Sequence, residues 1–181
     1  MTIPNLITVL RIILVPIFVI YMINNNTLAS LIVFIIASIS DALDGFLARV
    51  FHQKSNLGAH LDPLADKMLL MTAYITLAIL KMIPSWLAVL AISRDVIILL
   101  GVLILYLNRY PVKINPSLLS KATTVTQIAT VLVVLSHGYL NIEFLRIYIF
   151  WLAALLTIAS GLQYIRIGMV ILSEGANSNL A

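Results

Sequence analysis

The chain has 181 residues, of which 62% are hydrophobic and only 10% are charged, and its formal net charge is +4. An ordinary soluble domain carries roughly 25% charged residues, so this composition excludes that class. The basic residues are scattered at the ends of apolar segments instead of clustering on one face, which argues against a nucleic-acid partner. The lack of cysteine excludes disulfides and a thiol nucleophile.

Six apolar segments, separated by Pro, Asn and Gly, follow one another along the chain. A helix of about 20 apolar residues crosses a hydrocarbon layer of about 30 Å, and each segment is long enough to do so. The predicted spans are residues 6–23, 28–50, 61–82, 84–107, 118–137 and 142–170. We therefore expect an all-α integral membrane bundle of six transmembrane helices, with residues 1–181 forming a single domain. The sequence predicts a short frayed tail from about residue 172.

The first span lacks a basic leader and a small-residue cleavage site, so we expect a permanent helix and not a removable signal peptide. Lys and Arg near span ends favour the cytoplasmic side of a membrane. If the N-terminus is inside, only Lys81 and Arg146 fall outside. The residues then on the inner side are Arg11, Arg49, Lys54, Arg109, Lys113, Lys121 and Arg166. This bias predicts a multi-pass protein with a cytoplasmic N-terminus, in the inner membrane if the source is bacterial.

Four of the seven acidic residues are concentrated around the connection between the second and third predicted spans: Asp41, Asp44, Asp62 and Asp66. An ionised carboxylate inside a membrane costs at least a few kcal/mol unless it is paired, hydrated or metal-bound. Residues three or four apart share one face of a helix, so each pair points in one direction. The short connection predicts that the second and third spans are antiparallel neighbours. Both pairs should then meet at the cytoplasmic ends of these spans.

Four carboxylates held together repel one another, and a divalent cation relieves this repulsion better than protonation does. All-oxygen ligands suit Mg²⁺, Mn²⁺ or Ca²⁺, whereas zinc sites draw on His or Cys. Mg²⁺ keeps coordination positions open for phosphate oxygens, which indicates phosphoryl chemistry. Gly45, Ala48 and Gly58 leave room for a nucleotide near the helix backbones, and Arg49 supplies a positive charge for a diphosphate.

These residues form one pattern, Asp41-x2-Asp44-Gly45-x2-Ala48-Arg49-x8-Gly58-x3-Asp62-x3-Asp66. The pattern resembles the signature of the CDP-alcohol phosphotransferase family at every fixed position and gap. Further segments are similar to the phosphatidyl-transferring members: Pro4 to Arg11, Leu61 to Lys67, Ser93-Arg94-Asp95, and Ser120 to Gln127. The resemblance covers about residues 3 to 130.

The resemblance implies a six-helix fold, a homodimer, and a polar cavity open to the cytoplasm that holds two Mg²⁺ or Mn²⁺ ions. It implies that Asp41, Asp44, Asp62 and Asp66 ligate the metals, and that Asp66 is also the catalytic base for the attacking hydroxyl. The expected CDP-binding residues are Gly45, Ala48, Arg49, Gly58, Asn5 and Thr8, although Asn5 and Thr8 have a simpler alternative as caps of the first helix. The expected acceptor-binding residues are Arg94, Lys121, Arg109 and Lys113.

The implied reaction moves the phosphatidyl group of CDP-diacylglycerol, within the lipid bilayer, to a glycerol-type alcohol and releases CMP. Two acceptors remain open: phosphatidylglycerol, which gives cardiolipin, and glycerol 3-phosphate, which gives phosphatidylglycerol phosphate. The subgroup that uses glycerol 3-phosphate carries Glu, Arg and Gly where this chain has Asp95, Val102 and Ser120. A dianionic acceptor needs several cations, so the missing arginine favours phosphatidylglycerol and the cardiolipin synthases of the eukaryotic type.

Several simpler readings compete with these assignments. A salt-bridge network would leave the four aspartates short of cations, and a divalent cation transporter would not require the small residues and the arginine of the signature. Arg94 and Asp95 are adjacent on a helix, so they should point in different directions, and either has the alternative of a hydrogen bond to a neighbouring helix. Arg11 is expected to snorkel to the headgroups. Trp86 and Trp151 fit an interfacial aromatic belt.

Overall fold

The computed structural model describes residues 3–50, 56–107, 117–137 and 143–178; within these ranges, it describes the side chains except those of residues 3–8, 41–50, 56–66, 106 and 172–178. Six helices follow one another: α1 (Ile3–Ile23), α2 (Thr27–Val50), α3 (Asn56–Ile79), α4 (Ser85–Leu107), α5 (Leu118–Ser136) and α6 (Glu143–Ser178). The described residues contain no strand. The prediction of an all-α chain with six helices is therefore confirmed.

Two helices, α3 and α6, differ by five residues or more from a predicted bound. α3 begins at Asn56, so Gly58 lies in its first turn and not in the connection. α6 has 36 residues and continues to Ser178, through the segment predicted to fray. At about 1.5 Å per residue α6 is about 54 Å long, which exceeds the roughly 30 Å hydrocarbon layer. Helical structure thus continues well past the apolar part of the sixth segment.

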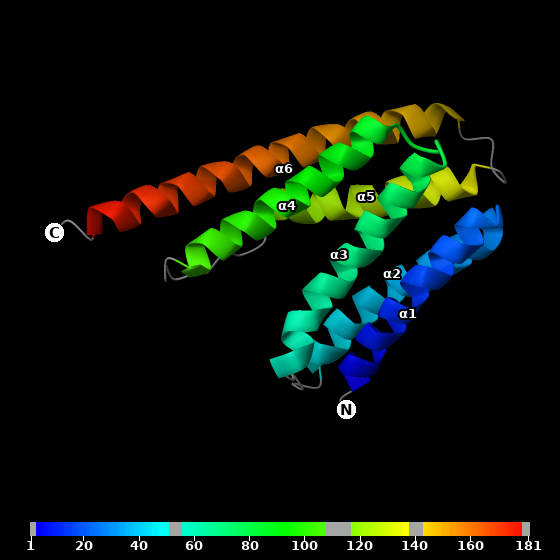
Figure 1. Cartoon of the computed structure of the whole chain (residues 1–181), viewed down its shortest axis with the longest axis horizontal. Helices are drawn as coiled ribbons and strands as arrows, with labels where there is room; N and C mark the ends of the chain where they lie inside the picture. Colours follow the sequence, from blue (N-terminus) through cyan, green and yellow to red (C-terminus); the bar gives the residue numbers. More distant parts are fainter. Residues whose placement is uncertain (1–2, 51–55, 108–116, 138–142, 179–181) are drawn as a thin grey trace.

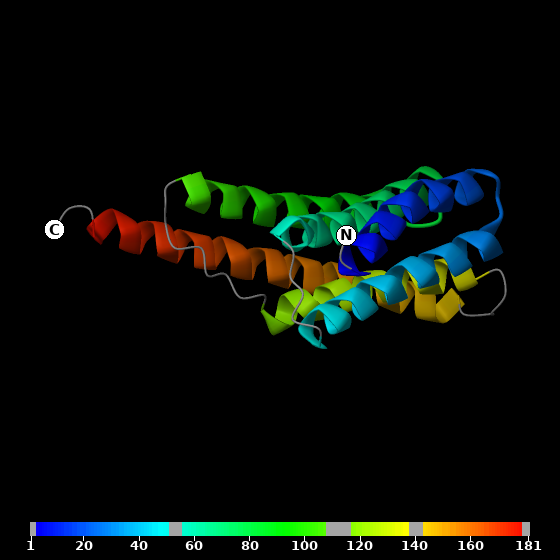
Figure 2. The ribbon, with the colours of Figure 1, turned by 90° about the horizontal axis from the view of Figure 1, so that it is seen from below.

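The helices pack in two layers, as Figure 2 shows. One layer contains α1, α3 and α4, and the other contains α2, α5 and α6. α1 packs on α2, α5 packs on α6 and α4 packs on α6, while α1 also packs against α3. In Figure 1, α1–α3 and α4–α6 form two arms that converge near the α3–α4 turn and diverge toward the N-terminus. The turn between α3 and α4, at residues 80–84, is therefore the point where the arms join.

The α1–α2 and α3–α4 connections, both at the converged end, have the same backbone hydrogen-bond arrangement. Asn25 and Lys81 both have φ of 57°, the left-handed conformation. The N–H groups of Asn26 and Met82 reach back to the carbonyls of Tyr21 and Leu77, at 3.0 and 2.9 Å. This is the Schellman arrangement that satisfies the last carbonyls of a helix. Asn26 then caps α2, because its side-chain oxygen accepts a hydrogen bond from the Ala29 N–H at 3.1 Å.

Small and aromatic side chains fill the space between the layers. Ala37, Ala73 and Ala153 are completely buried and let neighbouring helices approach closely. Phe18 of α1 and Phe34 of α2 pack with ring centroids 5.8 Å apart. Many Leu, Ile and Val side chains point outward instead, which is the pattern of a surface that contacts lipid.

Three described helical segments are long and apolar enough to cross a membrane: Ser85–Leu105, Leu118–Ser136 and Glu143–Ile171. The described parts of the other three helices carry shorter apolar stretches, at Val9–Ile23, Thr27–Ser40 and Lys67–Ile79. The adjoining residues of these helices, 3–8, 41–50 and 56–66, have side chains outside the described set. That α1, α2 and α3 also cross the membrane stays a prediction.

Candidate functional site

The two aspartate pairs lie on helix ends that face the same end of the molecule. Asp41 and Asp44 occupy the last turns of α2, and Asp62 and Asp66 occupy the first turns of α3. Figure 1 shows both ends beside the N-terminus, away from the α3–α4 turn. The side chains of all four aspartates lie outside the described set, as do those of Gly45, Ala48, Arg49, Gly58, Asn5 and Thr8. Arg109 and Lys113 lie outside the described residues altogether.

The prediction that α2 and α3 are antiparallel neighbours is wrong in one respect. The two helices run in opposite directions (Figure 1), but they have no extensive packing contact in the described part of the chain. α3 lies in the layer of α1 and α4, whereas α2 lies in the other layer beside α5, so α2 and α3 are diagonal to each other (Figure 2). α1 packs against both of them. A short connection constrains only the two ends that it joins, and the pairing of helix bodies is decided by packing. The two aspartate pairs lie at the same end of the molecule even though α2 and α3 are not directly packed.

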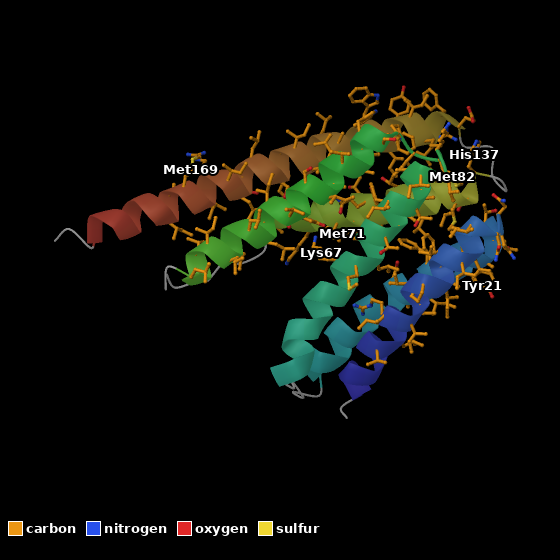
Figure 3. All side chains as sticks on the ribbon, in the orientation of Figure 1. Tyr21, Lys67, Met71, Met82, His137 and Met169 are labelled. Carbon is orange, nitrogen blue, oxygen red and sulfur yellow. The ribbon has the colours of Figure 1, made fainter. Side chains whose placement is uncertain are left out.

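A buried ionic cluster, formed by Lys67, Arg94 and Asp95, joins α3 to α4. Asp95 Oδ1 accepts hydrogen bonds from Arg94 Nη1 at 2.7 Å and from Lys67 Nζ at 2.8 Å. Arg94 and Asp95 are 3% and 4% exposed, whereas Lys67 is 26% exposed. Figure 3 shows Lys67 and Met71 one turn apart on α3, at the level where α3 passes α4 and α5. Because Lys67 follows Asp66 in the chain, this ion pair fixes the rotation of α3 at the turn that carries the last signature aspartate.

The cluster extends to α5 and α6 through Arg94. Its Nη2 donates to Ser120 Oγ at 2.6 Å and to Ser160 Oγ at 2.8 Å, and its Nε donates to Ser160 Oγ at 3.3 Å. The guanidinium also lies 5.8 Å from the ring centroid of Tyr164. Every guanidinium nitrogen therefore has a protein partner, and Arg94 joins three helices. Its role as an acceptor ligand stays a prediction.

The expectation that Arg94 and Asp95 point apart is wrong. Adjacent helical residues do leave the backbone in different directions, but the arginine side chain is long enough for its guanidinium to reach back to the Asp95 carboxylate. The alternative of a hydrogen bond to a neighbouring helix is confirmed, through Ser120 and Ser160. Lys121, which follows Ser120 on α5, is exposed. Its side chain is thus accessible beside the cluster, as an acceptor-binding role would require.

Arg11 is completely buried, so the expectation that it snorkels to the headgroups is wrong. It lies on α1, the helix that packs against both α2 and α3. A buried guanidinium is retained in a protein only with polar or anionic partners. Arg11 was not among the predicted site residues, although a basic residue within an apolar span is the signal that marks it.

A metal site cannot be built from the side chains that the structure describes. Within that set no three His, Asp or Glu side chains come together. The predicted ligands all fall outside it, so the metal prediction rests on the donor chemistry of the four aspartates. Carboxylates without His or Cys match the hard-oxygen preference of Mg²⁺ and Mn²⁺.

Helical chains with two aspartate pairs at one end of the molecule form a recognisable class of proteins. Comparison with known proteins identifies this class. Residues 1–159 match the family model described as CDP-alcohol phosphatidyltransferase. The chain belongs to this family. Together with the three long apolar helices, this membership makes the chain an integral membrane protein.

Two kinds of relative are similar to the chain over most of its length. It is 34% identical to cardiolipin synthase (CMP-forming) of Rattus norvegicus and 32% identical to that of Homo sapiens, with 92% of the chain covered in each case. It spans only 61% and 62% of those two proteins. It is 35% identical to CDP-diacylglycerol--glycerol-3-phosphate 3-phosphatidyltransferase of Bacillus subtilis, with 89% of the chain and 92% of the relative covered. The relatives therefore include both acceptor types that the sequence left open.

Proposed function

We propose that this chain is a phosphatidyltransferase that moves the phosphatidyl group of CDP-diacylglycerol to a glycerol-type alcohol and releases CMP. The observation that carries the proposal is the signature from Asp41 to Asp66, whose two halves lie on helix ends at one end of the molecule. Family membership and the printed names of both kinds of relative support it. A divalent cation transporter has no support of this kind.

The four aspartates are the proposed ligands of two Mg²⁺ or Mn²⁺ ions, which would neutralise the diphosphate when bound. In the reaction the acceptor oxygen forms a bond to the phosphatidyl phosphorus, and the bond from that phosphorus to the CMP oxygen breaks. Asp66 takes the hydroxyl proton, and Arg49 holds the diphosphate with Gly45, Ala48 and Gly58 lining the CDP site. Asn5 and Thr8 of α1 complete this CDP site. Positioning and charge neutralisation supply much of the rate, as in other phosphoryl transfers.

Buried Arg11 also belongs to this proposed site. It lies on α1, which packs against both helices that carry the aspartate pairs. A fixed cation on a helix that packs against both acid-bearing helices offsets part of the repulsion among the carboxylates before metals bind. Arg11→Met should therefore increase that repulsion in the metal-free site and tighten metal binding, which a lower metal concentration for half-maximal activity would reveal.

For the acceptor we favour phosphatidylglycerol. Val102 lines an apolar groove of about 310 Å³ between α4 and α6, together with Gly101, Tyr164 and Gly168. Tyr164 also contacts Arg94, so the groove begins beside the ionic cluster. An apolar lining suits a lipid acceptor better than free glycerol 3-phosphate, which needs cations. Lys121, Arg94, Arg109 and Lys113 are the proposed ligands of the acceptor phosphate in either case.

The deciding experiment supplies purified protein and Mn²⁺ with labelled CDP-diacylglycerol and compares phosphatidylglycerol with glycerol 3-phosphate in parallel. Formation of cardiolipin would support the favoured acceptor, and phosphatidylglycerol phosphate would support the alternative. Asp66→Asn should abolish transfer while the melting temperature stays within a few degrees of the unmodified protein. A lack of CMP release with every alcohol would refute the transferase proposal.

We also propose a homodimer with a cytoplasmic N-terminus and a cytoplasm-facing cavity. The excess of Lys and Arg on the aspartate side supports this orientation. Because the chain has no native cysteine, single variants such as Asn25→Cys and Lys54→Cys can be labelled without background. An impermeant maleimide applied outside the cell should label Asn25→Cys only, and labelling of Lys54→Cys would reverse the orientation. Cross-linking in native membranes tests the dimer.

A further inference from the structure

A second polar feature lies at the converged end of the molecule, far from the aspartate pairs. A hollow of about 420 Å³ opens between the α3–α4 turn and the first turns of α6. Lys81 and Arg146 line it, with Ser85 from α4 and an apolar floor that includes Ile83 and Phe150. Figure 3 labels Met82, which also lines the hollow, at this end of the bundle.

Two cations of the hollow come from separate elements and are held by different contacts. Lys81 is exposed, and its backbone is fixed by the hydrogen bonds that close the α3 turn, including that from its own N–H to the Ala78 carbonyl at 3.1 Å. The Arg146 guanidinium lies 5.9 Å from the ring centroid of Phe150. The Lys81 backbone and the Arg146 guanidinium are therefore held beside the hollow. Among the described residues that line it, these two cations are the only charged ones, which suits an anionic ligand.

The nearest described acidic side chain has a partner of its own. Glu143 lies one turn before Arg146 on α6, and its Oε1 lies 2.9 Å from His137 Nε2. No acidic residue is among the residues that line the hollow. The hollow is therefore positively charged as described.

The floor and the surroundings distinguish a lipid from a small soluble anion. Ile83 and Phe150 are 3% and 7% exposed, so they form a packed apolar floor beneath the cations. Trp86 and Trp151 follow the lining residues Ser85 and Phe150, and their rings lie 5.7 Å apart on the surface. Exposed tryptophans are typical of the membrane–water interface. A cationic rim over an apolar floor at this depth matches a phosphate headgroup attached to the first carbons of its acyl chains.

We propose that this hollow binds the headgroup of an anionic phospholipid, in the leaflet opposite the aspartate pairs, with Lys81 and Arg146 at the phosphate. The proposal does not depend on the proposed enzymatic activity. It assigns the converged end a lipid ligand that is separate from the substrates of the aspartate end.

Trp86 and Trp151 are the only tryptophans of the chain, so their fluorescence reports on this region. The protein is reconstituted into phosphatidylcholine vesicles with increasing fractions of brominated phosphatidic acid, which has no headgroup alcohol and cannot be an acceptor. Brominated phosphatidic acid should quench the tryptophan fluorescence more than the same fraction of brominated phosphatidylcholine does. Removing each cation, in Lys81→Gln and Arg146→Gln, should reduce this preference by about fivefold.

The matched control is Arg166→Gln, which removes an exposed cation from α6 outside the hollow and should keep the preference. Equal quenching by the two brominated lipids, or an unchanged preference in the double variant with an unchanged melting temperature, would overturn the proposal. Excess inorganic phosphate should not relieve the quenching. If it does, the hollow binds free phosphate and the lipid assignment is wrong.

Discussion

The buried ionic cluster permits a quantitative prediction for Asp95→Asn. The substitution preserves the shape of the side chain but removes the only negative charge that contacts Arg94 and Lys67 in the described part of the chain. Removing one partner of a buried ion pair destabilises a protein by about 3–5 kcal/mol, because the other charge stays buried. Arg94 is 3% exposed and bears nearly the full penalty, whereas Lys67 is 26% exposed and can be partly solvated. We therefore expect a loss of about 3 kcal/mol.

The measurement is reversible unfolding in mixed micelles, with circular dichroism as the readout. Arg94→Met alone should be similarly destabilising, because it leaves Asp95 with only the partly exposed Lys67. The double variant Arg94→Met, Asp95→Leu should recover much of the loss, since apolar replacements of a buried ion pair are often neutral or stabilising. Arg166→Gln, at an exposed position of α6, is the control and should change stability by less than about 0.5 kcal/mol.

If the free energy of unfolding of Asp95→Asn lay within about 1 kcal/mol of that of the unmodified protein, the cluster would have no structural role. This threshold is the roughly 1 kcal/mol that a typical substitution costs. A second readout tests whether it also positions the neighbouring signature turn. Lys67→Met should lower kcat more than it raises KM for CDP-diacylglycerol, because it frees the rotation of α3 next to Asp66 without touching the nucleotide. An unchanged kcat would refute that positioning role.

Three further predictions follow from other parts of the structure. Asn25→Ala should lower stability by about 1 kcal/mol, because alanine tolerates the left-handed backbone poorly, whereas Asn25→Gly should not; thermal unfolding of both would be measured. Ala153→Leu should destabilise by about 1–3 kcal/mol, because the fully buried position on α6 has no room for the longer side chain, and an unchanged melting temperature would contradict this packing. Dialysis against EDTA should abolish CMP release, and Mg²⁺ or Mn²⁺ should restore it while Ca²⁺ or Zn²⁺ restores less; activity that survives chelation would contradict the metal-dependent proposal.

Helix positions were predictable from the sequence because turn-forming residues and runs of apolar residues determine the helix ends locally. The Asn24–Asn26 and Lys81–Pro84 breaks mark the first and third connections. Three helices, α2, α4 and α5, agree with their predicted bounds within two residues at both ends, while α1 differs only at its start. The start of α3 was missed because Asn56 to His60 is polar, although nothing in that segment prevents a helix. The length of α6 was missed for the same reason.

Layer order and side-chain partners were not predictable in this way. The diagonal placement of α2 and α3 results from how α1 and α5 pack between them, and no local pattern encodes it. Apart from the adjacent Asp95, the partners of Arg94 are Ser120 of α5 and Ser160 of α6, which are distant in sequence. The signature aspartates were identified from residue type and spacing, and their convergence on metals stays a prediction.

The two arms join near Lys81, so a small tilt of α3 at this turn displaces the opposite end of the helix by a larger amount. α3 has 24 residues and is about 36 Å long, so a tilt of about 5° at the turn moves its far end by about 3 Å. Asp62 and Asp66 lie part of the way along α3 and move by about 2 Å in the same tilt, whereas the turn itself lines the Lys81–Arg146 hollow. A small tilt of α3 at the hollow is thus converted into a larger displacement at the aspartates. A ligand bound at the hollow can in this way change the spacing of charged groups at the opposite end of the molecule.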